Sequence, residues 1–190
     1  MRVGILGGTF DPIHNGHLFL AKKALKKLKL DKIIFIPAYL APHKTRIRVT
    51  PTAHRYNMVK LALFGEKKFE ISDIEIKRKG KSYSIDTLRQ FKRRYGQDTE
   101  IFFITGSDSL RGINKWKDLG GILRLCRFVV AKRPDFEIKN LPRDFIVIDI
   151  GAKNISASDI RDKVHEGADI TGLVPKKVRD YIKRHSLYLA

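Results

Sequence analysis

The segment GILGGTFDPIHNGH, residues 4–17, joins a short apolar run to a glycine-rich turn and to two histidines, His14 and His17. The apolar run predicts a buried strand, and the histidines stand where the first helix is expected to begin. The turn is not a dinucleotide-binding fingerprint, because Leu6 and Thr9 occupy positions where Gly-x-Gly-x-x-Gly requires glycine. It also lacks the Gly-Lys-Ser/Thr ending of the phosphate loop of P-loop ATPases. The turn must therefore serve another chemistry.

Strand-like apolar runs and helical periods alternate along the rest of the chain. The expected strands are VGIL, KIIFIP, FEISDIEI, EIFFIT, RFVVA and DFIVIDI. The expected helices are HLFLAKKALKKLK, TPTAHRYNMVKLALFG, SIDTLRQFKRRYG, SASDIRDKVHEG and VPKKVRDYIKRH, with Leu18, Ala21, Leu25 and Leu28 on the inner face of the first. This alternation predicts a Rossmann-like, doubly wound α/β fold with a mostly parallel sheet and helices on both faces. Since no repeat or linker interrupts it, we expect residues 1–190 to form a single domain.

The chain is strongly basic. It carries 39 Lys and Arg against 20 Asp and Glu, a net charge of +19, so it attracts anions such as nucleic acid, acidic membranes or phosphorylated small molecules. Composition does not choose among these, and a solvated lysine-rich surface is the alternative for any one cluster. No apolar run approaches the roughly 18 residues of a membrane helix, and no cationic start precedes a long apolar stretch. A single cysteine, Cys126, excludes an internal disulfide. These features predict a cytoplasmic protein that does not enter a membrane.

The two histidines stand three residues apart and therefore share one face of the first helical turn. Free N–H groups and the positive end of the helix dipole lie there, so His14 and His17 predict a phosphate site. One alternative is a zinc site, but no third ligand stands at a suitable local spacing, and we expect no protein-held metal. Another alternative is that the imidazoles only satisfy local backbone groups.

Two motifs then point to a family. GTFDPIHNGH resembles the Thr/His-x-Gly-His signature of the nucleotidylyltransferase superfamily, and ISASDIR resembles its partner motif through Ile155, Ser156 and Arg161. Nearly the whole chain is similar to the bacterial nicotinate mononucleotide adenylyltransferases, through PHK, HRYNMVKLA, KGKSYSIDTL, FFITGSDSL and VPKKVRDYI. The chain departs from that family at Ser158, where threonine is usual, and at APHK, which replaces a double proline. The resemblance implies transfer of AMP from ATP to nicotinate mononucleotide, in NAD biosynthesis, with release of pyrophosphate.

The resemblance also implies roles for particular residues. It assigns ATP binding to Gly8, Thr9, Phe10, His14, His17, Gly106, Asp108, Ile155, Ser156 and Arg161. Of these, His14, His17 and Arg161 would act on the reacting phosphates together with Lys44, which would bridge ATP and the acceptor. Gly106 and Asp108 would contact ribose hydroxyls, although Asp108 is alternatively the cap of a strand-end turn. Mg²⁺ would accompany ATP, held mostly by phosphate oxygens and water.

The acceptor site implied by the resemblance contains Lys44, Thr87 and Trp116. Trp116 is the only tryptophan and stands in a polar stretch, GINKWKDL, where an indole can stack on a pyridine ring. Thr87 and the backbone beside Trp116 would surround the nicotinate carboxylate. The alternative for Trp116 is an anchor in the apolar core.

Two rival functions remain open at this point. Another adenylyl- or cytidylyltransferase, with nicotinamide mononucleotide or phosphopantetheine as acceptor, would share both phosphate motifs but would not need SYSIDTL. A nucleic-acid-binding protein on this fold would explain the charge of +19. Its basic residues are dispersed, however, and no aromatic RNA-binding motif is present, so we expect only non-specific contact with nucleic acid. A homo-oligomer is compatible with the sequence.

Overall fold

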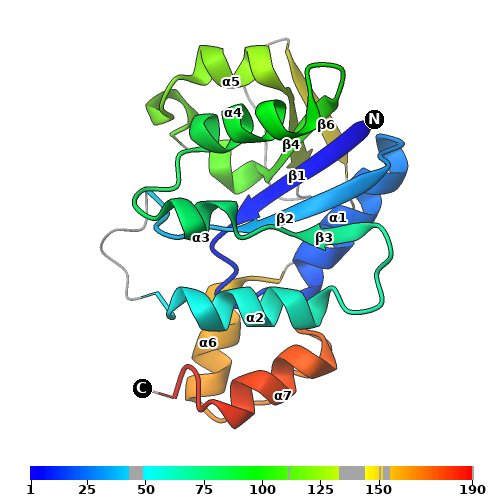
Figure 1. Ribbon diagram of the computed structural model, residues 1–190. Helices are drawn as coiled ribbons and strands as arrows, with labels where there is room; N and C mark the ends of the chain where they lie inside the picture. Colours follow the sequence, from blue (N-terminus) through cyan, green and yellow to red (C-terminus); the bar gives the residue numbers. More distant parts are fainter. Residues whose placement is uncertain (43–48, 111, 133–143, 150, 152–154, 190) are drawn as a thin grey trace.

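Six strands of the described chain form one sheet in this computed structural model (Figure 1). The structure describes residues 1–42, 49–110, 112–132, 144–149, 151 and 155–189, and at 108 and 109 the backbone alone. The strands are β1 (Arg2–Gly8), β2 (Lys32–Pro37), β3 (Phe69–Ile71), β4 (Glu100–Gly106), β5 (Arg127–Lys132) and β6 (Phe145–Asp149). All pairs are parallel, in the order β3-β2-β1-β4-β5-β6. This is the strand order of doubly wound nucleotide-binding folds, so the predicted fold class is confirmed.

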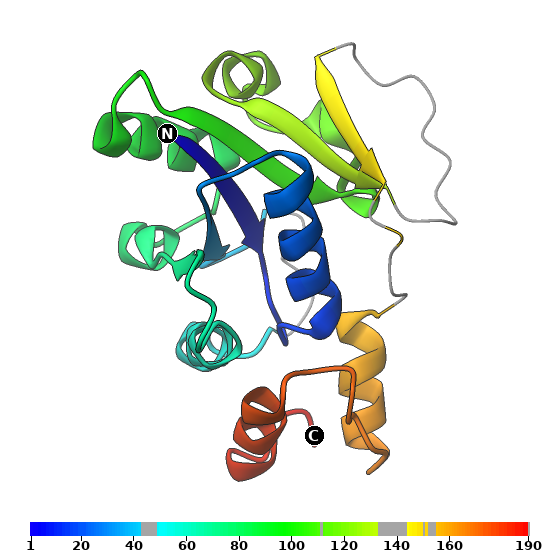
Figure 2. The same ribbon diagram turned by 90° about the vertical axis from the view of Figure 1, so that its right-hand side faces the viewer.

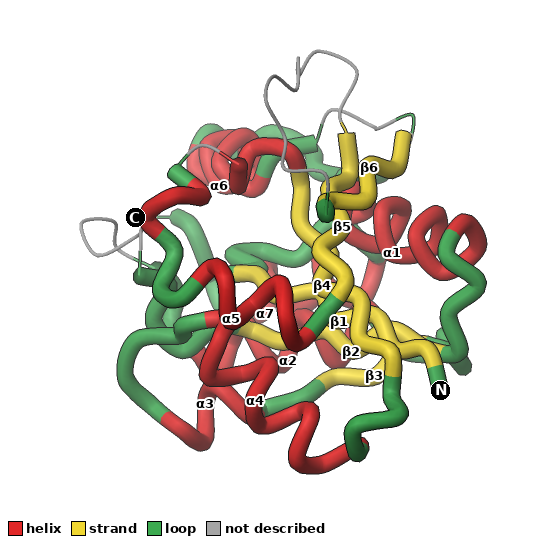
Figure 3. Tube along the Cα trace, turned by 90° about the horizontal axis from the view of Figure 1, so that it is seen from above, coloured by secondary structure: helices red, strands yellow, loops and turns green. Residues whose placement is uncertain are grey.

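Helices cover both faces of the sheet (Figures 2 and 3). They are α1 (Asn15–Lys27), α2 (Thr52–Ala62), α3 (Ile74–Arg78), α4 (Ser84–Tyr95), α5 (Leu119–Leu125), α6 (Ala157–His165) and α7 (Lys176–Arg184). Buried side chains of α1, α2, α6 and α7 form one apolar cluster with the sheet, and those of α4 and α5 form a second cluster. No helix in the described ranges is both long and apolar enough to cross a membrane.

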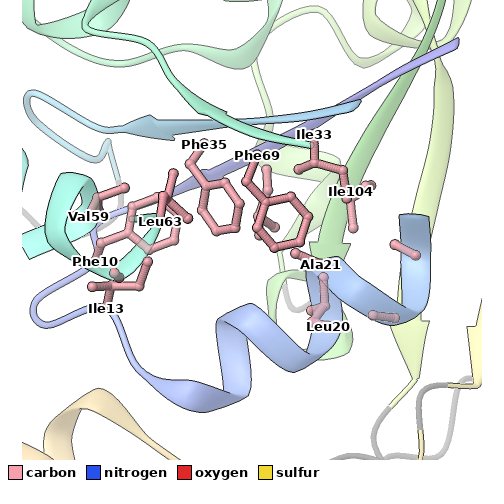
Figure 4. Packing of buried hydrophobic residues seen from close by; sticks show 14 of the residues in the cluster. Phe10, Ile13, Leu20, Ala21, Ile33, Phe35, Val59, Leu63, Phe69 and Ile104 are labelled. Carbon is pink, nitrogen blue, oxygen red and sulfur yellow. The ribbon is translucent and has the colours of Figure 1, made fainter. Parts of the chain in front are cut away.

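The first apolar cluster anchors the turn that follows β1 (Figure 4). Phe10 and Ile13 of this turn are almost completely buried, and the Phe10 ring lies 5.9 Å from the ring of Phe35 on β2. Phe35 in turn packs at 5.4 Å against Phe69 on β3. The glycine-rich turn is therefore fixed to the core by its own apolar residues, which positions the polar residues that alternate with them.

The structure corrects the expected strand over FEISDIEI. Only Phe69–Ile71 is extended, and α3 follows after Ser72, whose hydroxyl accepts the amide N–H of Ile74 at 3.4 Å. Lys77 and Asp73 form an ion pair at 3.0 Å along this short helix. The helix turns Glu75 inward, to a residue exposure of 7%. The alternating isoleucines matched a strand pattern, but two of them, Ile74 and Ile76, lie on the helix.

Smaller differences concern helix ends and faces. The expected serine cap of α4 is wrong, because Tyr83 is the N-cap and Ser84 lies inside the helix. Helix α5 was not predicted. It begins after Asp118, whose side chain accepts the amide N–H of Gly121 at 2.9 Å. On α1 the buried residues are Leu20, Ala21 and Ala24, and the predicted Leu18, Leu25 and Leu28 only flank them.

Candidate active site

The two histidines of the opening segment meet at the start of α1. His14 is the N-cap residue, is 4% exposed, and its amide N–H donates to Nδ1 of His17 at 3.2 Å. The two imidazole rings stack with centroids 3.6 Å apart, and the ring of Phe10 meets His17 edge-on at 5.0 Å. The predicted pairing of His14 and His17 on one helical turn is therefore present, beside the N–H groups of a helix N-terminus.

Gly16 is required by close packing at this point. A Cβ added to it would lie 3.0 Å from Nδ1 of His14, 3.1 Å from its Cε1 and 3.5 Å from Cβ of Ile155. A side chain here would therefore crowd the His14 ring and require it to shift by a few tenths of an ångström. The same contact places Ile155, from the C-terminal motif, directly against the first turn of α1.

The C-terminal motif joins the site through α6, whose start lies beside the start of α1 (Figure 2). Nη1 of Arg161 donates to the backbone oxygen of Asp11 at 2.8 Å, across 150 positions of sequence. Ser156 caps α6 by accepting the Asp159 amide at 3.4 Å, and its hydroxyl lies 2.6 Å from that of Ser158. Two helix N-termini, two imidazoles and a guanidinium thus gather at the carboxyl end of β1, which is an arrangement of donors suited to phosphate.

A buried carboxylate holds this assembly to the C-terminal segment. Asp11 is 5% exposed, and its carboxylate accepts the amide of Thr50 at 3.1 Å and the hydroxyl of Tyr188 at 2.7 Å. Burial, followed by the charge of Asp11, raises the pKa of Tyr188 well above its usual range, so this phenol remains a donor. The chain beyond α7 therefore braces the turn that carries the histidines.

Arg55 of α2 ties three loops together and is only 1% exposed. Its guanidinium donates to the backbone oxygens of Thr50 at 2.9 Å, Thr9 at 2.7 Å and Tyr39 at 3.2 Å, and to the hydroxyl of Thr52 at 3.1 Å. Burial lowers its pKa and the Asp11 charge opposes that shift, so the guanidinium still carries its charge. No motif in the sequence predicts a role for Arg55. A lone arginine on the same stripe as the buried Met58, Val59 and Ala62 was the available signal.

A cavity of about 420 Å³ opens at the carboxyl ends of β1, β2 and β4, next to the start of the turn that leads to the histidines. Gly8 and Thr9 form one wall, and Thr87 and Trp116 stand among the residues that line the rest. The Trp116 ring meets Phe103 at 5.9 Å and Phe128 at 5.7 Å, so it is partly an anchor in the second apolar cluster. Trp116 also lines the cavity, so a role in stacking on a ligand stays a prediction beside its role as a core anchor.

Polar groups on α3 and α4 line the same cavity. Thr87 is 1% exposed, and its hydroxyl donates to Oε1 of Glu75 at 2.6 Å while accepting from Nη2 of Arg78 at 3.1 Å. Burial raises the pKa of Glu75, and hydrogen bonds from Thr87 and Ser82, with the charge of Arg78, oppose that rise. Glu75 was missed by the sequence analysis because it fell inside the expected strand.

The other predicted site residues fall into two groups. Gly106 ends β4, and Asp108 lies in the 3-10 turn Ser107–Leu110 that follows, at the same edge of the sheet as the histidines. Lys44 lies outside the described residues, and the side chain of Asp108 is not described. Among the described residues, no group of three or more His, Cys, Asp or Glu side chains could hold a metal ion.

Comparison with known proteins agrees with this fold and site. A model of the cytidylyltransferase-like family matches residues 5–163, a span that includes both phosphate motifs. The chain belongs to the cytidylyltransferase-like family.

Relatives of known name narrow this class. A protein of Clostridium tetani is 45% identical over 98% of both chains, and one of Thermoanaerobacter sp. is 43% identical over 99% of this chain and 94% of its own. Both are named probable nicotinate-nucleotide adenylyltransferase. A solved structure of the Plasmodium falciparum nicotinic acid mononucleotide adenylyltransferase, complexed with NaAD, superposes with a TM-score of 0.81. It is 21% identical and covers 98% of this chain and 97% of its own, so it supports the fold. The resemblance inferred from the motifs is confirmed.

Proposed function

We propose that the protein transfers AMP from ATP to nicotinate mononucleotide, forming deamido-NAD and pyrophosphate. The observation that carries this function is the end-to-end relationship to nicotinate-nucleotide adenylyltransferases. The site fits it, because a cavity large enough for a pyridine ring adjoins a cluster of phosphate donors at the carboxyl edge of the sheet. Acceptors such as nicotinamide mononucleotide or phosphopantetheine, and binding of nucleic acid, are not favoured.

This reaction depends on holding the two charged substrates in position, and it needs no side chain to remove a proton from the nucleophile. The phosphate of the mononucleotide is already ionised at neutral pH, so it attacks the α-phosphorus of ATP without a general base. The P–O bond to the β-phosphate breaks as the new P–O bond forms, and pyrophosphate carries away the electron pair. Holding two anions in line and stabilising the leaving group then supply the rate enhancement.

The donors of the site suit that demand. We assign His14 and His17, at the start of α1, to the ATP phosphates, with Arg161 and the N-terminus of α6 on the leaving pyrophosphate. Gly8, Thr9 and Phe10 present backbone groups at the same place, Ile155 and Ser156 shape the start of α6, and Gly106 and Asp108 are assigned to ribose. The assignment is supported by the stacked imidazoles and by the Arg161 bond to Asp11. Lys44 is retained as a proposed bridge between the two phosphates.

We infer that Mg²⁺ enters with ATP. The polar groups at the phosphate site are imidazoles, amides and a guanidinium, and its buried carboxylate, Asp11, already accepts two hydrogen bonds. These groups suit phosphate oxygens, which would themselves hold the metal with water. Bound there, Mg²⁺ would supply neutralisation of phosphate charge.

We assign the cavity to the nicotinate ring. The exposed part of Trp116 offers a flat surface for a pyridine, and Thr87 stands among the cavity residues.

Because both apolar clusters share one sheet, we also infer a single domain over residues 1–190. The thiol of Cys126, whose pKa burial raises to about 12, stays protonated and is compatible with the cytoplasmic location we infer.

Pyrophosphate release tests the proposed function. The protein is incubated with ATP, Mg²⁺ and nicotinate mononucleotide, nicotinamide mononucleotide or phosphopantetheine in parallel. We expect the nicotinate compound to give the highest kcat/KM and deamido-NAD as the product. Faster release with phosphopantetheine, or release with no acceptor preference, would contradict the assignment. Retention of RNA that falls steeply with salt would instead favour a nucleic-acid role.

A further inference from the structure

The cavity assigned to the nicotinate ring contains a buried carboxyl group, Glu75, whose hydrogen bonds bear on which ligand it accepts. Oε1 of Glu75 accepts a hydrogen bond from the hydroxyl group of Thr87 at 2.6 Å, and Ser82 also forms a hydrogen bond with the Glu75 carboxyl group. A threonine hydroxyl has one proton to give and two lone pairs to accept with. Since Nη2 of Arg78 already donates to Thr87 Oγ1, the Thr87 proton is committed to Glu75 while Glu75 is ionised.

The hydrogen bond from Thr87 to an ionised Glu75 disfavours binding of a ligand that carries a carboxylate. An ionised Glu75 lies among the residues that line the cavity, and it withholds the Thr87 proton from any other carboxylate. A neutral carboxamide suffers no such repulsion and brings N–H donors of its own. With Glu75 ionised, the cavity therefore suits nicotinamide better than nicotinate.

Protonation of Glu75 reverses this preference. The carboxyl group gains a proton from solvent and donates it to Thr87 Oγ1, which uses its second lone pair. The Thr87 proton is then released from Glu75, and a ligand carboxylate competes for it with the backbone oxygen of Tyr83, which lies 3.4 Å from Oγ1. The repulsion between two carboxylates also disappears. We propose that Glu75 sets the preference for acid over amide by taking up one proton when the nicotinate carboxylate binds, acting through Thr87 as a positioning residue. This inference rests on the proposed function.

The charged groups around Glu75 are compatible with a change in its protonation state. Arg78 on the same helix approaches Oε1 at 3.9 Å, and Tyr83, Lys115 and Lys117 face the cavity from the other walls. Lys117 is shared with Asp86, at 3.3 Å, on α4. Burial raises the pKa of Glu75 despite these neighbours, and a second carboxylate in the cavity would raise it further. The proton returns to solvent when the product leaves.

The pH dependence of acceptor preference tests the proposal. The ratio of kcat/KM for nicotinate mononucleotide to that for nicotinamide mononucleotide is measured between about pH 6 and 9. If one acceptor is not turned over, the ratio of the two 1/Ki values replaces it. Both acceptors carry the same phosphate, so its titration cancels in the ratio. Because the protonated form binds the acid, we expect the ratio to fall as pH rises through the pKa of Glu75, approaching about tenfold per pH unit. Calorimetry in buffers of different ionisation enthalpy should show more proton uptake with the acid than with the amide.

Glu75→Gln supplies the decisive variant, because an amide carries the donor of a protonated carboxyl group and has no charge. We expect it to keep the preference for the acid and to make the ratio independent of pH. Glu70→Gln, at an exposed carboxylate on β3, is the matched control and should keep the pH dependence of the parent. A flat ratio with equal proton uptake in the parent protein would overturn the proposal, as would loss of acid preference in Glu75→Gln. If that variant fails to fold, the parent measurements alone decide. Absence of pyrophosphate release with either acceptor would instead refute the proposed function.

Discussion

Replacing Arg55 with methionine removes a side chain that bonds three loops around the site. The guanidinium of Arg55 donates to the backbone oxygens of Thr9, Tyr39 and Thr50 and to the hydroxyl of Thr52, at 2.7 to 3.2 Å. Methionine keeps much of the volume and adapts to irregular space, so the loss is mainly one of hydrogen bonds and charge.

The size of the effect follows from burial. Arg55 is only 1% exposed, so its guanidinium makes these hydrogen bonds inside the protein. Each buried acceptor left without a donor costs about 1–3 kcal/mol, and removing one charge of a buried network costs about 3–5 kcal/mol. We therefore expect the free energy of unfolding to fall by about 3–5 kcal/mol and Tm by roughly 6–20 °C. Since Thr9 lines the acceptor cavity, kcat should also fall by about 10–100-fold well below Tm.

Thermal and urea denaturation followed by circular dichroism measure the stability of Arg55→Met against the parent. Lys60→Met, on the exposed side of the same helix, is the control and should change stability by less than about 0.5 kcal/mol. A Tm of Arg55→Met within about 2 °C of the parent would refute the assigned role of the guanidinium.

Three further substitutions probe the site. Trp116→Ala should raise the acceptor KM about 5- to 150-fold and leave the ATP KM nearly unchanged, because stacking on an aromatic ring is worth roughly 1–3 kcal/mol; steady-state kinetics with an unchanged acceptor KM would contradict this. Gly16→Ala brings a methyl group within 3.0 Å of the His14 ring, so kcat should fall about tenfold or more, and parental kcat in a folded variant would show that the ring position is not needed. Tyr188→Phe removes the donor to the Asp11 carboxylate and should cost about 1.5–3 kcal/mol in urea denaturation at neutral pH, with a cost under about 0.5 kcal/mol as the contrary result.

The fold was predictable because its strands are dense in Val, Ile and Phe and are separated by helical periods. The segment from Phe69 to Ile76 is rich in isoleucine, which is typical of a strand, but its second half, with Glu75, is part of a helix. The helix α5 was missed because Gly120 and Gly121 stand in its first turn and obscure its start. In both places packing against the rest of the chain overrode the local pattern.

Site residues could be predicted from the sequence only where they belong to a short motif. His14 and His17 lie on one helical turn, so their spacing reveals them. Tyr188 bonds the carboxylate of Asp11 across 177 positions of sequence, and Arg55 bonds the backbone oxygen of Thr9 across 46 positions. No periodicity in the sequence links such partners. The arginine on the buried stripe of α2 was the one local sign of that network.

The arrangement of both substrates around this site can be tested directly by a crystal structure of the protein with deamido-NAD. We predict that the pyridine ring lies in the cavity against Trp116, that its carboxylate lies beside Thr87, and that the diphosphate lies at the stacked histidines near the start of α6. A pyridine ring outside this cavity, or a diphosphate remote from His14 and His17, would contradict the joining of the two motifs into one adenylyl-transfer site.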